Sequence, residues 1–176
     1  MSKKSLFNAL IAACGLLGTH VVLAQTCNSS MTDKTPNSRY TVNNDGTVSD
    51  LWTGLMWAQC SQGQTWASNG GAGSCSGTTS SLTWQNALTT AETVTLASHS
   101  DWRLPNMKEL SSLVARNCYD PAINETIFPS TPSSKFWSSS PRYSSSSTWY
   151  VTFYYGYNYY HGRSFSYTVR VVRDGQ

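Results

Sequence analysis

The cysteines, read together with the N-terminus, most limit how this chain can fold. Lys3 and Lys4 precede an apolar stretch at residues 6–17, and Val22-Leu23-Ala24 suits signal peptidase. We therefore expect residues 1–24 to be a signal peptide that is cleaved after Ala24. The apolar stretch is shorter than the roughly 20 residues of a membrane-spanning helix, so no stable membrane anchor is expected after cleavage.

Removal of the leader leaves an even number of cysteines: Cys27, Cys60, Cys75 and Cys118. In an exported protein this indicates two disulfides, for which three pairings are open. Cys60 and Cys75 bracket a Gly/Ser-rich segment that needs a covalent tie, which favours Cys60–Cys75 and Cys27–Cys118. Zinc binding is disfavoured because no two cysteines have the close spacing of zinc ligands. No metal and no cofactor is expected.

Composition indicates one polar domain outside the cytoplasm. We expect an N-terminal segment over residues 25–39 and a single domain over residues 40–176, a size within the usual range of one domain. Only 12% of the residues are charged, and loss of the leader's two lysines leaves ten basic residues against nine acidic ones. No long basic tract is present, so nucleic acid is not an expected partner. The expected location is the periplasm or the cell exterior.

The first half of the mature chain carries a hairpin signal. Asn44-Asp45-Gly46 lies between β-branched residues and tolerates positive φ, so residues 40–49 are predicted to form a β-hairpin. Residues 55–57 form a short apolar strand. Residues 62–81 are nearly all Gly, Ser, Thr and Asn, which predicts a surface loop closed by its disulfide.

Two helices are predicted after this loop. Apolar residues recur about one helical turn apart from Trp84 onward, Thr83 can cap this helix, and the helix should fade near residues 97–98. Asn106 and Glu109 have the spacing of a capping box, which predicts the start of a second helix.

Strands are predicted again in the C-terminal third. Residues 136–139 are a strand candidate, and residues 149–154 alternate in period two, with one face in the core and the other in water. Gly156 and Asn158 are expected to end that strand, and residues 167–173 to form the last one. The order indicates an α+β fold in which two helices pack on a twisted antiparallel sheet, stapled by disulfides.

Several motifs occur in a recognisable order: Asn-Asp-Gly-Thr-Val and Thr-Gly-Leu-Met-Trp within residues 40–57, Thr-Trp-Gln-Asn-Ala-Leu at 83–88, Asp-Trp-Arg-Leu-Pro-Asn at 101–106, Phe-Trp-Ser-Ser at 136–139, and Val-Arg-Val-Val-Arg at 169–173. Together they resemble the Lcl C-terminal domain family, over residues 40–176. The resemblance implies a C-type lectin-like fold and a binding scaffold more often than a catalyst. The family's namesake domain is associated with bacterial adhesion and sulfated polysaccharide binding, so the resemblance implies that function here.

The segment from Trp149 to Tyr167 carries seven tyrosines, mixed with Ser, Gly and Asn. Tyrosine offers a large contact area with few rotors and a ring that can stack on sugars, while the small polar residues supply adaptable hydrogen bonds. The run from Tyr155 to Tyr160 breaks the strand alternation, so some of its rings must face water or a partner. The predicted ligand-binding residues are Tyr155, Tyr157, Asn158, Tyr159, Tyr160, His161, Arg163 and Arg142.

Basic side chains could meet sulfates or carboxylates through forked hydrogen bonds, and the candidates are Arg142, Arg163, Arg170, Arg173 and Lys135. Arg170 and Arg173 are expected instead to pair with Asp101 or Glu109 as structural bridges. Arg103 is also interpreted as structural.

Catalysis has little support in the sequence. Asp45 and Asp50 lie in and beside a hairpin, His99 and His161 have no nearby nucleophile motif, and the serines lack a nucleophile elbow. The predicted function is therefore an exported, metal-independent module that recognises glycans, or host or matrix surfaces. The alternative is an envelope protein whose aromatic face meets another protein, including a second copy of itself. An enzyme is the least favoured class.

Overall fold

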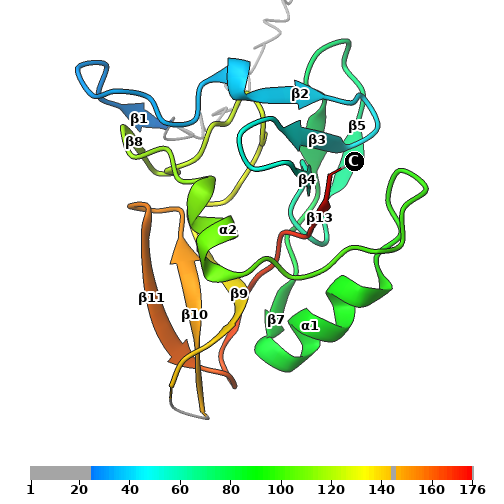
Figure 1. Cartoon of the computed structure of the whole chain (residues 1–176), viewed down its shortest axis with the longest axis vertical. Coiled ribbons are helices and arrows are strands. Elements are labelled where there is room, and N and C mark those ends of the chain that lie inside the picture. Colours follow the sequence, from blue (N-terminus) through cyan, green and yellow to red (C-terminus); the bar gives the residue numbers. More distant parts are fainter. Residues whose placement is uncertain (1–24, 144–145, 176) are drawn as a thin grey trace, which may run out of the picture.

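The computed structural model describes residues 25–143 and 146–175, so the predicted signal peptide lies outside the described residues. Strands dominate, with 36% of residues in strands and 13% in helices (Figure 1). In the described part of the chain, neither helix has the length and apolar character needed to cross a membrane.

One large sheet has four antiparallel strands in the order β13-β4-β3-β2. These strands are β2 (Tyr40–Val42), β3 (Thr47–Asp50), β4 (Leu55–Ala58) and β13 (Val172–Asp174). The predicted hairpin is present between β2 and β3, where Asn44 and Gly46 have φ of 60° and 88°. Asp45 stabilises the turn, because its Oδ1 accepts a hydrogen bond from the Thr47 backbone N–H at 2.9 Å.

The other large sheet has five strands in the order β11-β10-β9-β12-β7. They are β7 (Ser81–Thr83), β9 (Lys135–Pro141), β10 (Ser147–Thr152), β11 (Tyr157–Gly162) and β12 (Ser166–Thr168). Strand β12 runs parallel to β9, and the other pairs are antiparallel. Two small sheets complete the fold, from β1 (Thr26–Cys27) with β8 (Cys118–Tyr119), and from β5 (Thr65–Ala67) with β6 (Ser74–Ser76).

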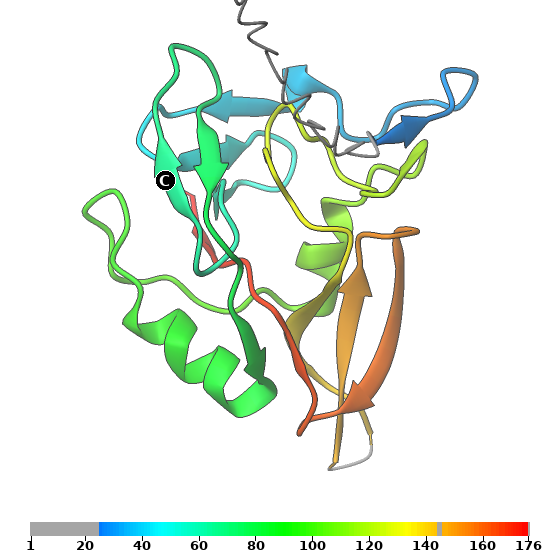
Figure 2. The same ribbon diagram turned by 180° about the vertical axis from the view of Figure 1, so that it is seen from behind.

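Both predicted helix starts are confirmed. The Thr83 side chain caps α1 (Trp84–Thr93), and the full capping box of Asn106 and Glu109 opens α2 (Met107–Ser112). Helix α1 ends before residues 97–98, because Val94 is already extended. A single turn of 3-10 helix covers Asn37–Arg39. Figures 1 and 2 show α2 against β9 and β10, and α1 beside β7.

The predicted α+β, C-type lectin-like class with two helices on one antiparallel sheet is corrected to a mostly β fold with four sheets. The helices are short, and the Gly/Ser-rich loop contributes strands that composition alone did not predict. In that loop Trp66 pairs with Cys75 between β5 and β6, and a Cβ on Gly73 would lie 2.1 Å from the Trp66 Nε1. The loop is therefore wrapped closely around a tryptophan.

Three strand predictions in the C-terminal third are also wrong. Asn158 does not end a strand but lies inside β11, opposite Val151 of β10. The predicted last strand is divided, because β12 belongs to the five-stranded sheet and β13 to the four-stranded sheet. The wet face predicted for residues 149–154 is covered at Tyr150 and Thr152, which are both buried.

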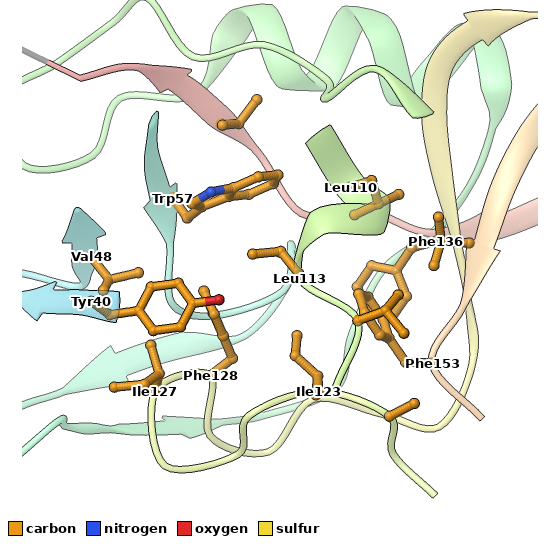
Figure 3. Packing of buried hydrophobic residues seen from close by; sticks show 14 residues of the cluster. Tyr40, Val48, Trp57, Leu110, Leu113, Ile123, Ile127, Phe128, Phe136 and Phe153 are labelled. Atoms are coloured by element: carbon orange, nitrogen blue, oxygen red, sulfur yellow. The ribbon is translucent and has the colours of Figure 1, made fainter. Parts of the chain in front are cut away.

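The main hydrophobic core joins the two large sheets through α2 (Figure 3). Trp57 from β4, Leu110 from α2 and Phe136 from β9 are fully buried, and each stabilises the fold by about 1.5–3 kcal/mol through burial. Phe153 packs edge-on against Phe136, with ring centroids 4.9 Å apart. A second cluster includes α1 and extends through Trp102, Trp137 and Tyr150.

Both disulfides have the pairing that the sequence favoured, Cys27–Cys118 and Cys60–Cys75. Arg173 forms the expected ion pair with Asp101, at 2.7 Å. Glu109 pairs instead with Arg103, at 2.8 Å, a residue interpreted as structural without a named partner.

Arg170 is the exception, because it has no carboxylate partner in the described part of the chain. Its side chain is fully buried, and it donates to the backbone carbonyls of Ala58 and Gln59 and to the hydroxyl of Thr131. Burial lowers the pKa of Arg170 to about 9, which still leaves the guanidinium charged at neutral pH. The prediction that Arg170 pairs with Asp101 or Glu109 is therefore wrong.

A second buried cation, Arg39, does have an acidic partner. Its Nε donates to Asp50 Oδ1 at 2.8 Å and its Nη2 donates to Oδ2, with both side chains buried. Burial raises the pKa of the Asp50 carboxyl, but hydrogen bonds from Arg39, from the Thr53 hydroxyl and from the Trp52 N–H more than offset this, so its pKa lies below the usual value.

Replacing Arg170 should cost much of the stability of the fold. In Arg170→Met, two buried carbonyls lose their donors, and each such loss costs about 1–3 kcal/mol. We expect the free energy of unfolding in urea to fall by about 3 kcal/mol, whereas Lys108→Met, on the exposed side of α2, should change it by less than about 0.5 kcal/mol. Equal stability of the two variants would contradict this role for Arg170.

The Arg39–Asp50 pair should make stability depend on pH. Asp50→Asn leaves a buried cation unpaired, which should cost about 3 kcal/mol at neutral pH. Because the folded pKa of Asp50 is depressed, its contribution is present above the unfolded pKa of about 3.9 and is lost as pH falls through the folded pKa. Urea unfolding at several pH values should show a constant gap between wild type and variant down to about pH 4, and a shrinking gap below it. A gap that stays unchanged in strong acid would refute the assignment.

Candidate functional site

A groove of about 410 Å³ crosses one end of the five-stranded sheet. Its walls are four tyrosines, six serines or threonines, and Lys135. No Asp, Glu, His or Cys is among these lining residues. We call this feature the tyrosine groove.

Strand register explains why these side chains form one row. Thr152 of β10 lies opposite both Lys135 of β9 and Tyr157 of β11. On the other side of β9, Thr168 of β12 lies opposite Ser81 of β7. Every strand of the sheet therefore contributes to the groove. Adjacent strands lie about 4.8 Å apart, so the row is about 19 Å long.

Lys135 is the one cation of the groove. Its Nζ lies 5.1 Å from the centroid of the Tyr167 ring and 5.4 Å from that of Tyr150, and it donates to the Tyr167 hydroxyl at 3.5 Å. Within residues 25–143 and 146–175, Lys135 forms no ion pair. Its charge is therefore available to an anionic group.

The floor of the groove is a packed set of rings. Tyr167 lies 4.3 Å from Trp137 and 5.2 Å from Tyr150, measured between ring centroids. His161 Nδ1 hydrogen-bonds the Tyr167 hydroxyl, and the His161 ring stacks on Phe165 at 3.7 Å. Burial raises the pKa of Tyr167 and that of Tyr150, so both phenols keep their protons at neutral pH.

A tight turn between β10 and β11 forms one end of the groove. Gly156 has φ of 73°, and a Cβ there would lie 2.5 Å from the Val114 side chain, so the turn requires glycine. The turn presents Tyr154 and Tyr155, whose rings meet edge-on with centroids 4.3 Å apart. Tyr155 also lies near-parallel to Tyr157, at 6.5 Å.

Half of the predicted ligand-binding residues lie on the face of the five-stranded sheet that carries the tyrosine groove, or directly behind the groove. Tyr155 and Tyr157 line the groove, and their side chains are 61% and 50% exposed. Tyr159 lies opposite Tyr150, one step along the same face, and is also exposed. His161 does not line the groove, but it positions Tyr167.

The other predicted residues lie elsewhere. Asn158 points to the opposite face, where its Nδ2 contacts Met107 of α2. Tyr160 packs against Trp149 on that side, and the Arg142 guanidinium lies 3.4 Å from the Tyr160 ring centroid. The Arg163 guanidinium stacks on Trp84 at 4.2 Å. The structure therefore does not bring Arg142 and Arg163 to the groove.

Tyr159 and Tyr160 nevertheless touch, with near-parallel rings 4.5 Å apart. Consecutive residues of a strand point to opposite faces, so this contact can form only around an edge. Strand β11 is the edge strand here. The stacked pair therefore covers the outer rim of the sheet.

The predicted site omitted Tyr154, Tyr167 and the six hydroxyl residues of the groove. Lys135 was named only as a candidate cation. Local pattern does not identify these residues, since the row depends on the order of strands in the sheet. The one usable signal in the sequence was the period-two alternation of residues 149–154, which predicts that Thr152 and Tyr154 lie on the same face of a strand.

Comparison with protein-family models matched residues 46–173 to the model described as the Lcl C-terminal domain. This range covers well over half of the chain and includes every residue that lines the tyrosine groove. A search of curated proteins found no match.

Proposed function

The chain belongs to the Lcl C-terminal domain family, and from that premise we propose that it is an exported binding module whose tyrosine groove holds a glycan chain. The observation that carries the proposal is the make-up of the groove, which is lined by four tyrosines, six serines or threonines and one lysine. Two disulfides are compatible with an oxidising compartment outside the cytoplasm.

Each part of the groove suits a different part of a sugar. Tyrosine rings can cover the apolar face of a pyranose, and serine or threonine hydroxyls can exchange hydrogen bonds with sugar hydroxyls. Lys135 can bind a sulfate or carboxylate, since no lining carboxylate competes for it. The proposed ligand class is therefore a glycan chain that carries acidic groups.

The proposal is a binding function without catalysis and without a metal. The groove lining has no His, Asp, Glu or Cys, and its one amine, Lys135, donates to the Tyr167 hydroxyl. Among the described residues, no three His, Cys, Asp or Glu side chains gather closely enough to hold a metal ion.

A protein partner is the second candidate, and the position of β11 at the edge of the sheet favours it. An edge strand presents unpaired backbone groups to which an extended segment of another chain can add. Tyr159 and Tyr160 at this rim would then contact that protein. We propose this as the alternative to glycan binding, with a second copy of the chain as one such partner.

Groove variants should lose glycan affinity and keep their stability. On an array of neutral, carboxylated and sulfated glycans, the mature chain should bind acidic glycans equally with and without chelator. Tyr157→Ala should weaken binding about tenfold through lost ring contact, and Lys135→Gln by about tenfold or more through the lost charge-assisted hydrogen bond.

The matched controls are Tyr143→Ala and Lys108→Gln, which remove an exposed ring and an exposed cation outside the groove. Both should bind like wild type. Glycan binding that the groove variants leave intact would reject the site. No binding to any glycan, together with self-association or protein capture that Tyr159→Ala abolishes, would favour the protein partner.

A further inference from the structure

A second hollow of about 410 Å³ adjoins the tyrosine groove. One wall is the N-terminal segment around Cys27 and Met31, and the other runs from Arg116 to Tyr119. Tyr155 lines this hollow and also lines the groove. One ring is therefore the shared boundary of two cavities.

The path between the two cavities is a row of rings. The Tyr119 and Tyr155 centroids are 6.4 Å apart with planes tilted by 31°, and those of Tyr155 and Tyr157 are 6.5 Å apart with planes at 17°. All three rings are substantially exposed. They give a polymer an even series of stacking surfaces that leads from one cavity to the other.

The two regions are fixed relative to each other by backbone hydrogen bonds. The Asp120 N–H donates to the Tyr154 carbonyl at 2.9 Å, and the Ala122 N–H donates to the Phe153 carbonyl. Figures 1 and 2 both show the β1–β8 pair next to the turn between β10 and β11. The row of rings is therefore preformed, which lowers the cost of ordering it on binding.

The hollow and the groove are lined by the same kind of charge. Its lining contains Arg116 and no Asp or Glu, as the groove contains Lys135 and no Asp or Glu. Arg116 is exposed and forms no salt bridge within the described ranges. Each cavity thus offers one free cation to an acidic ligand.

The Cys27–Cys118 disulfide ties one wall of the hollow to the other. This bond joins β1 to β8, and the Asn28 N–H adds a hydrogen bond to the Asn117 carbonyl at 2.7 Å. The N-terminal wall precedes residue 46, where the match to the family model begins. The hollow is therefore completed by a part of this chain that the family model does not cover.

We propose that this hollow is a second subsite, built by the Cys27–Cys118 disulfide, for the same acidic glycan chain that the tyrosine groove binds. The inference rests on the proposed function of the groove. It deepens that function, because the ligand must be long enough to cross Tyr155 and must carry acidic groups for both Lys135 and Arg116.

The test compares two probes of the same chemistry, a trisaccharide and a decasaccharide of dextran sulfate, by titration calorimetry on the mature oxidised chain. The decasaccharide should bind wild type at least about tenfold more tightly. Arg116→Gln and Tyr119→Ala should each weaken the decasaccharide about tenfold and leave the trisaccharide unchanged, since one charge-assisted or ring contact is worth about that factor. Lys135→Gln should weaken both probes.

A double variant, Cys27→Ser with Cys118→Ser, tests the wall itself. It should bind the trisaccharide like wild type and lose the same part of the decasaccharide affinity as Arg116→Gln. If this variant does not fold, Arg116→Gln and Tyr119→Ala still decide the question.

Three outcomes would overturn the proposal in distinguishable ways. If Arg116→Gln and Tyr119→Ala do not weaken the decasaccharide while Lys135→Gln does, the groove acts alone, and only the second subsite is rejected. If Lys108→Gln weakens decasaccharide binding as much as Arg116→Gln does, the loss of affinity reflects the net charge of the protein and not a contact in the hollow, and the second subsite is rejected. If wild type binds neither probe, acidic-glycan binding by the groove is rejected, and the second subsite with it.

Discussion

The buried guanidinium of Arg170 is the interaction on which the arrangement of the two large sheets depends. Arg170 lies where the chain leaves β12 in one sheet and enters β13 in the other. From there it reaches the end of β4 through the carbonyls of Ala58 and Gln59, and the segment before β9 through Thr131. A planar fork with five donors can satisfy several acceptors in different directions, and no other side chain has as many donors. These hydrogen bonds offset part of the cost of burying the charge, since the Arg170 Nε is buried without a partner among the described residues and burial still lowers the pKa of the guanidinium.

The tyrosine groove follows from this junction. Arg170 ties the segment that follows β12 to the end of β4 and to Thr131, and pairing with β9 places Tyr167 of β12 beside Lys135. The groove is thus built mainly on strands, with only the turn at Gly156 and the serines before β9 supplied by loops. Side chains held by a sheet keep their spacing better than side chains on loops, so the surface is organised before a ligand arrives. His161 contributes to this order from outside the groove by holding the Tyr167 hydroxyl.

The N-terminal segment shows how a disulfide can shape a surface as well as stabilise a fold. Cys27–Cys118 closes a sequence separation of 91 residues and brings the start of the described chain to the rim of the aromatic face. Tyr155 stands between the cavity that this segment completes and the groove of the family domain. The region where the two cavities meet is therefore assembled from three distant parts of the chain, joined by the disulfide and by backbone hydrogen bonds.

Local sequence was enough for the features that neighbouring residues decide. The turn at Asn44-Asp45-Gly46, the caps Thr83 and Asn106, and the abundance of tyrosine could all be read in advance, because each depends on side chains within a few positions of one another. Three other features could not be read in advance from local sequence. These are the mostly β class, the division of the last strand, and the separation of Asn158 and Tyr160 from the groove. Those depend on which strands become neighbours and in which register, and a shift of one residue moves a side chain to the other face of a sheet. Only the packing of distant segments around Arg170 and the core settles that choice.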